Sequence, residues 1–181
     1  MAIVGLPLWL VHWLIVQRQV TRLPVETRSL ARKLYVYAVL GVATGFVMTA
    51  AVSLLQWIFD LRSFSGYPLA AVTVWGGLWA FHWRTETAEG QPTAETLGIR
   101  RLYIYLVSLA SLAMLAVGSG RAIHVVLLEG YESVASLSVL VPEEVGLWRE
   151  PMREALAVAL VGGAVWWSHW LRFARTDLGS V

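Results

Sequence analysis

Long apolar stretches constrain this chain more than any other feature of its sequence. A helix that crosses the hydrocarbon core of a bilayer needs about 20 apolar residues, and its backbone amides must be paired within the segment. Four segments meet or approach this requirement, and a fifth is slightly short, which tilting or local thinning would accommodate. The expected helices are residues 2–17, 34–59, 67–83, 102–126 and 155–173. The sequence therefore predicts an all-α integral membrane bundle, with about five transmembrane helices in one domain over residues 1–181.

The composition favours lipid as the main solvent. Hydrophobic residues make up 57% of the chain and charged residues 14%, and the mean hydropathy is +0.63. Soluble domains are about 45–50% apolar and about 25% charged. Cysteine is absent, which excludes disulfides, iron–sulfur clusters and covalently attached haem. Asparagine is also absent and Lys33 is the only lysine, a bias that fits either a thermophilic source or a GC-rich genome.

The basic residues alternate between the connections and so predict a topology. Residues 18–33, residues 84–101 and the C-terminal tail are rich in arginine, whereas the connection at 130–150 is acidic. Lysine and arginine mark cytoplasmic loops. We therefore expect a bacterial inner (cytoplasmic) membrane protein with its N-terminus outside and its C-terminus in the cytoplasm. The net charge of +2 does not indicate nucleic-acid binding, because no recognition motif accompanies it.

Two short patterns recur along the chain. Trp-x-x-His-Trp occurs at residues 9–13, 79–83 and 166–170, and a basic pair followed by Leu-Tyr-x-Tyr occurs at 32–37 and 100–105. The chain then reads A-B-A-B-A, where an A helix ends in His-Trp and a B helix begins with the basic pair. We interpret this order as duplication of a two-helix hairpin, with copies at about 5–66 and 76–130 and a third partial copy at 160–177.

These helix ends resemble an uncharacterised family of bacterial multi-pass membrane domains, the domain of unknown function with serial number 5671. The resemblance covers nearly the whole chain and implies a membrane fold, but no chemistry. The chain departs from a pure two-helix repeat because it opens with an A helix. A start codon upstream of Met1 and a helix supplied by a partner both remain open as explanations.

The recurring aromatic residues and histidines allow two interpretations. Trp and Tyr gather at membrane interfaces, which favours a belt of interface anchors. The anchors are Trp9, Trp13, Trp79, Trp83, Trp166, Trp170, Tyr35, Tyr37, Tyr103 and Tyr105. Alternatively, three parallel A helices would place His12, His82 and His169 at one depth, where they would contact head groups, bind a metal or ligate haem b. No carboxylate in the same expected helices accompanies these histidines.

Two further groups of residues are candidates for contacts. Arg121 and His124 lie one turn apart in the second B helix, where they would meet a head group, a quinone or a partner carboxylate at the outer leaflet. Small residues permit close approach of helices. The glycines expected to serve helix packing are Gly41, Gly45, Gly76, Gly77, Gly162 and Gly163.

The chain carries no recognisable catalytic motif. A nucleophile elbow, a zinc-binding His-Glu-x-x-His and a phosphate loop are all missing from the sequence, so we expect no enzyme activity and no cofactor. The leading hypothesis is an accessory or structural subunit of a larger bacterial membrane complex, in contact with lipids and with other subunits or copies of itself. The alternatives are a redox component that binds haem b or quinone through histidine, and a channel or transporter.

Overall fold

The computed structural model describes residues 7, 10–11, 13–18, 29–90, 93–135 and 148–174, and within them the chain is all-helical, as predicted. Residues 13–18 are helical. The longer elements are α2 (Leu30–Ile58), α3 (Gly66–Ala88), α4 (Ala94–Ala135), α5 (Arg149–Trp166) and its π-helical continuation η2 (Trp167–Ala174). The described residues contain no strand.

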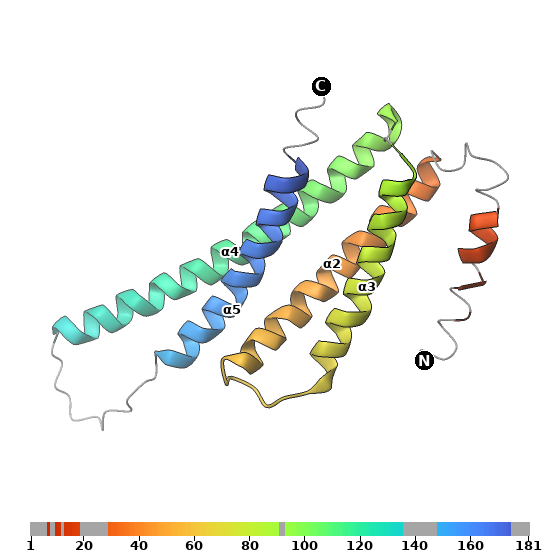
Figure 1. Cartoon of the computed structure of the whole chain (residues 1–181). Helices are drawn as coiled ribbons and strands as arrows, with labels where there is room; N and C mark the ends of the chain where they lie inside the picture. Colours follow the sequence, from red (N-terminus) through yellow and green to blue (C-terminus); the bar gives the residue numbers. More distant parts are fainter. Residues whose placement is uncertain are drawn as a thin grey trace.

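The helices form two antiparallel hairpins. α2 pairs with α3 and α4 pairs with α5, and α2 also contacts α4 and α5, so the hairpins meet along α2 (Figure 1). The starts of α2 and α4 and the ends of α3 and η2 lie at one end of the molecule (Figure 1). The core lies near that end and consists of Val36, Tyr37, Leu40, Tyr103, Ile104 and Val107. Residues of both basic-Leu-Tyr segments are therefore part of the core.

Local signals set the ends of the first hairpin. Ser29 caps α2, because its side chain accepts a hydrogen bond from the backbone amide of Arg32 at 3.3 Å. Beyond the C-cap of α3, Gly90 has a φ of +89°, the left-handed conformation in which helices commonly stop. α3 thus runs five residues past the predicted end at residue 83. It includes Glu86 and is capped by Glu89, two glutamates that the sequence pattern places in a linker.

α4 and α5 approach closely enough for backbone contact. A Cβ atom added to Gly118 would lie 2.5 Å from the amide nitrogen of Ala159, and one added to Gly162 would lie 2.5 Å from the amide nitrogen of Leu115. Gly163 and Gly41 have ordinary contacts at 3.5 and 4.0 Å. A Cβ on three of the predicted packing glycines would meet nothing within 4 Å in the described structure; these are Gly45, Gly76 and Gly77.

Two of the helices, α2 and α4, are long and apolar enough to cross a membrane by length and composition. At 1.5 Å per residue, the 42 residues of α4 span about 63 Å, roughly twice the hydrocarbon thickness. The other expected spans fall on α3 and on α5 with η2, and half of residues 2–17 lie outside the described residues. α3 and α5 are not among the helices that pass this test.

Candidate functional site

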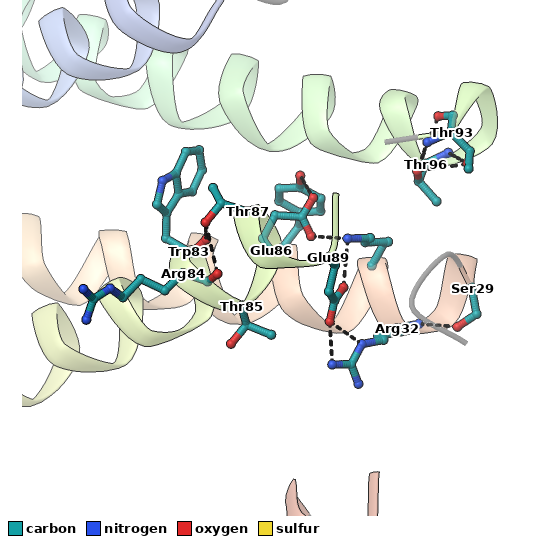
Figure 2. A network of polar contacts seen from close by, with 12 residues as sticks. Ser29, Arg32, Trp83, Arg84, Thr85, Glu86, Thr87, Glu89, Thr93 and Thr96 are labelled. Carbon is teal, nitrogen blue, oxygen red and sulfur yellow. Dashed lines mark hydrogen bonds and ion pairs between the residues drawn. The ribbon is translucent and has the colours of Figure 1, made fainter. Parts of the chain in front are cut away.

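Four charged side chains are buried together where α2 begins and α3 ends (Figure 2). This charge cluster consists of Arg32, Lys33, Glu86 and Glu89, whose side chains are between 1 and 8% exposed. Charged residues are almost never this deeply buried unless they are paired. The charge cluster is the most distinctive chemical feature of the described chain.

Every carboxylate oxygen of the charge cluster accepts a hydrogen bond. Arg32 donates from Nε and Nη2 to one oxygen of Glu89, at 2.8 and 2.5 Å. Lys33 Nζ bridges the two glutamates, at 2.5 Å from Glu86 and 2.9 Å from Glu89. The remaining oxygen of Glu86 accepts from the hydroxyl of Tyr37 at 2.7 Å. The two positive and two negative charges cancel. Their attraction and hydrogen bonds therefore offset the free-energy cost of removing the four charged groups from water.

The helix dipoles disfavour the basic pair and the acidic pair of the charge cluster if each pair is considered without the other. Cations are unfavourable near a helix N-terminus and anions near a C-terminus, by about 0.3–1 kcal/mol each. Arg32 and Lys33 lie in the first turn of α2, whereas Glu86 lies in the last turn of α3 and Glu89 is the C-cap of α3. Each pair therefore stabilises the other, which joins these two helix ends electrostatically.

Trp13, in the described N-terminal helical residues, packs against the charge cluster. The Arg32 guanidinium carbon lies 5.7 Å from the ring centroid of Trp13. The same ring contacts His82 with centroids 5.6 Å apart. Because Trp13 is itself buried, it faces the protein interior, as do Tyr37 and Tyr103. The other described motif rings are half-buried or exposed: Trp79, Trp83, Trp166, Trp170, Tyr35 and Tyr105.

The hydroxyl of Tyr103 forms a second polar centre that joins four helical elements. It lies 3.0 Å from Trp79 Nε1 in α3, 3.1 Å from His169 Nε2 in η2 and 3.4 Å from Thr44 Oγ1 in α2. Its ring lies beside that of Tyr37, with centroids 5.6 Å apart. The Tyr103 centre, defined as Tyr103, Trp79, His169 and Thr44, is therefore adjacent to the charge cluster.

The two described histidines of the Trp-x-x-His-Trp motifs, His82 and His169, have different neighbours. His82 packs beside Tyr35 with ring centroids 6.0 Å apart, and His169 packs beside Tyr103 at 5.8 Å. Each ring places Nδ1 within 3.0 Å of the carbonyl oxygen four residues earlier, so Nδ1 carries the proton. A neutral imidazole that donates from Nδ1 accepts at Nε2, so Tyr103 donates to His169.

The hydrogen bonds of the two histidines limit their use as ligands of a metal or haem b. A metal or haem b ligand at His169 Nε2 would have to displace the hydroxyl of Tyr103. Across the described residues, no group of three or more His, Asp or Glu side chains could hold a metal ion. His12 and Trp9 lie outside the described residues. Arg121 and His124 are both exposed on α4.

The sequence pattern does not identify Glu86 and Glu89 as site residues, because the charged segment from Arg84 onward has the composition of a linker. A usable signal was present, since Glu86 follows His82 by four residues and precedes Glu89 by three, the spacing of one helix face. His82 thus shares α3 with the carboxylate of Glu86, and Glu89 follows as the C-cap of the same helix. Aligned on His-Trp, the third A segment has Phe173 and Thr176 at the two glutamate positions.

Replacing Tyr103 with phenylalanine should lower the free energy of unfolding by about 1–3 kcal/mol. The change removes one hydroxyl and leaves Trp79 Nε1 and His169 Nε2 without their shared partner. Chemical unfolding of the purified chain in mild detergent measures the effect. Tyr105→Phe is the matched control, because that ring is 41% exposed. Equal stability of the two variants would show that the Tyr103 centre contributes nothing.

Comparison with known proteins places most of the chain in one family. Residues 1–77 and 101–180 match the family described as a domain of unknown function, DUF5671. No curated protein and no solved structure matches the chain. The matched segments contain Arg32, Lys33 and Tyr103, whereas Glu86 and Glu89 lie between them. The chain thus belongs to the DUF5671 family.

Proposed function

We propose that this chain is a non-catalytic multi-pass membrane protein that serves as an accessory or structural subunit of a larger bacterial membrane assembly. The observation that carries the proposal is the exposure of large apolar side chains along the two membrane-length helices. Leu34 and Ile58 of α2 and Leu109 of α4 are each more than half exposed. Soluble monomers rarely expose large contiguous apolar patches, so lipid or protein is the expected surrounding.

The chemistry of the described polar groups supports a structural role. The carboxylates of the charge cluster are neutralised by Arg32 and Lys33, and each of their oxygens is already hydrogen-bonded. A general base or a proton carrier needs a group that can reach its substrate. The charge cluster is instead suited to hold α2 against α3.

The proposal includes five spans in the A-B-A-B-A order, with the charge cluster at the cytoplasmic end. The repeat order is supported by a pair of matching contacts, Tyr35 with His82 and Tyr103 with His169. In both, the first Tyr of a B helix packs on the His of the following A helix. This correspondence is what duplication of a hairpin would produce.

Membrane extraction followed by native electrophoresis tests the function. We expect the chain to remain in the membrane pellet after an alkaline carbonate wash, because hydrocarbon surrounds its apolar faces. After mild detergent extraction, it should migrate above its 20.1 kDa mass together with specific partner proteins. Release by carbonate would refute the membrane location. Migration as a lone monomer would refute the subunit role.

A further inference from the structure

A hollow of about 480 Å³ lies between α2 and α3 at the opposite end of the hairpin from the charge cluster. Ser53 and Trp57 of α2 form one wall. Arg62, Ser63 and Ser65 of the connecting turn, together with Tyr67 of α3, form the other. The volume falls in the range of about 300–1,000 Å³ that small-molecule sites occupy. The hollow is open to the surroundings at this end of the molecule.

A second hollow of about 100 Å³ continues the first along the contact between α2 and α3. The two share Ser53 and Tyr67 as lining residues, and the smaller one is also lined by Phe46, Ala50 and Ala71. From Ser53 to Phe46 the groove follows α2 for about 10 Å. The stacked rings of Phe46 and Trp75, with centroids 4.3 Å apart, flank its inner end. Together the hollows form one groove with a wide mouth and a narrow slot.

The groove changes from polar to apolar along its length. In the slot, Thr49 and Ser53 direct their hydroxyl protons to backbone carbonyls of α2, so these side chains offer no donor to a ligand. At the mouth, the Ser65 side chain makes no capping hydrogen bond with α3. Arg62 is exposed there and forms no ion pair with any described residue. The mouth therefore presents a guanidinium beside serine hydroxyls.

The charge at the mouth selects the kind of occupant. A guanidinium matches a phosphate group in shape and charge. Among the described residues that line the mouth there is no carboxylate to attract a head-group cation; the nearest along the chain, Asp60, does not line it. The mouth thus favours a phosphate head group with net negative charge, and the slot admits one narrow alkyl chain.

We propose that this groove binds one anionic membrane phospholipid, with its phosphate at Arg62 and an acyl chain in the slot between Phe46 and Ala71. This inference rests on the proposed membrane location. In the proposed topology the groove opens at the outer leaflet, opposite the cytoplasmic charge cluster. Since α2 is long enough to cross a membrane, the slot runs parallel to the acyl chains of surrounding lipid.

Native mass spectrometry of the full chain in detergent micelles tests the proposal. Phosphatidylglycerol and phosphatidylcholine with identical acyl chains are titrated separately, and the dissociation constant of the first bound lipid is measured. We expect the wild type to prefer phosphatidylglycerol. Arg62→Gln should weaken phosphatidylglycerol binding about tenfold, the effect of losing a charge-assisted hydrogen bond, and should abolish the preference.

Two further variants make the test specific. Arg84→Gln removes the same charge from an exposed site near the opposite end of α3, so it should bind as the wild type does. Ser65→Asp adds a negative charge at the mouth but keeps a good N-cap residue for α3. It should therefore lose the preference for phosphatidylglycerol even if Arg62→Gln fails to fold.

Several outcomes would overturn the lipid site. These are equal affinity of the wild type, Arg62→Gln and Ser65→Asp for phosphatidylglycerol, a preference for phosphatidylcholine, or adducts of detergent alone. Displacement of the bound lipid by millimolar inorganic phosphate would show a simple anion site instead. If carbonate releases the chain from membranes, the proposed function fails as well. A membrane-embedded chain without the Arg62-dependent preference contradicts only the lipid site.

Discussion

Replacing Glu86 with alanine should lower the free energy of unfolding by about 3–5 kcal/mol, the usual cost of removing one partner from a buried ion pair. The change leaves Lys33 Nζ with Glu89 alone and leaves the hydroxyl of Tyr37 without its acceptor. It also leaves an uncompensated positive charge at a site where Lys33 is 3% exposed. Chemical unfolding of the purified chain in mild detergent measures the loss.

Glu129→Ala provides the control for this variant. Glu129 is an exposed glutamate of α4, and substitutions at such positions usually stay within about 0.5 kcal/mol. The double variant Lys33→Met with Glu86→Leu should recover much of the lost stability, because apolar side chains of similar size can replace a buried pair. A loss below about 1 kcal/mol for Glu86→Ala would contradict the proposal that the charge cluster holds α2 against α3.

The presence of four of the helices could be predicted from the sequence, whereas several of their ends could not. α4 runs from Ala94 to Ala135, beyond the predicted 102–126 at both ends, and α3 continues past residue 83. Apolar runs specify helices because hydrocarbon leaves the backbone no other partner. The prediction ended the helix at residue 83, since the following residues are charged. α3 continues to Ala88 because Glu86 and Glu89 are neutralised by Arg32 and Lys33, more than fifty residues earlier in the chain. The spacing of His82, Glu86 and Glu89 indicates one helix face, but no local pattern identifies the distant residues that neutralise the two glutamates.

The roles of the aromatic residues were only partly predictable for a similar reason. Tyr37 and Tyr103 suit a membrane interface by type and position, but the structure buries both and gives their hydroxyls partners on other helices. An interface anchor and a buried hydrogen-bond donor have the same sequence signature. Only the packing of α2 against α3 and α4 distinguishes them.

Glycine spacing likewise identifies a small residue but not its partner helix. Gly41-x-x-x-Gly45 is the pattern expected for close packing, yet a Cβ on Gly45 would have no neighbour within 4 Å in the described structure. The close backbone approaches lie instead between α4 and α5, where Gly118 faces Ala159 and Gly162 faces Leu115. Which glycines allow close helix packing depends on the surface of the neighbouring helix that faces them.

Replacing Gly162 with leucine should therefore destabilise the second hairpin by about 3 kcal/mol, near the upper end of typical overpacking costs. The new Cβ would lie 2.5 Å from the Leu115 amide nitrogen and 2.8 Å from the Ser111 carbonyl oxygen, and backbone atoms cannot move aside as a flexible side chain can. Gly77→Leu is the control, because that position has open space. Unfolding in detergent measures both variants, and equal losses would contradict direct backbone contact.

The same substitution should also disturb the Tyr103 centre, because His169 follows Gly162 by seven residues, roughly two helical turns along α5 and η2. Moving α5 away from α4 would lengthen the bond between His169 Nε2 and the Tyr103 hydroxyl, which is 3.1 Å. If so, Gly162→Leu and Tyr103→Phe remove part of the same interaction. The double variant should then lose less stability than the sum of the single losses. Simple additivity would mean that helix packing and the Tyr103 centre stabilise the chain independently.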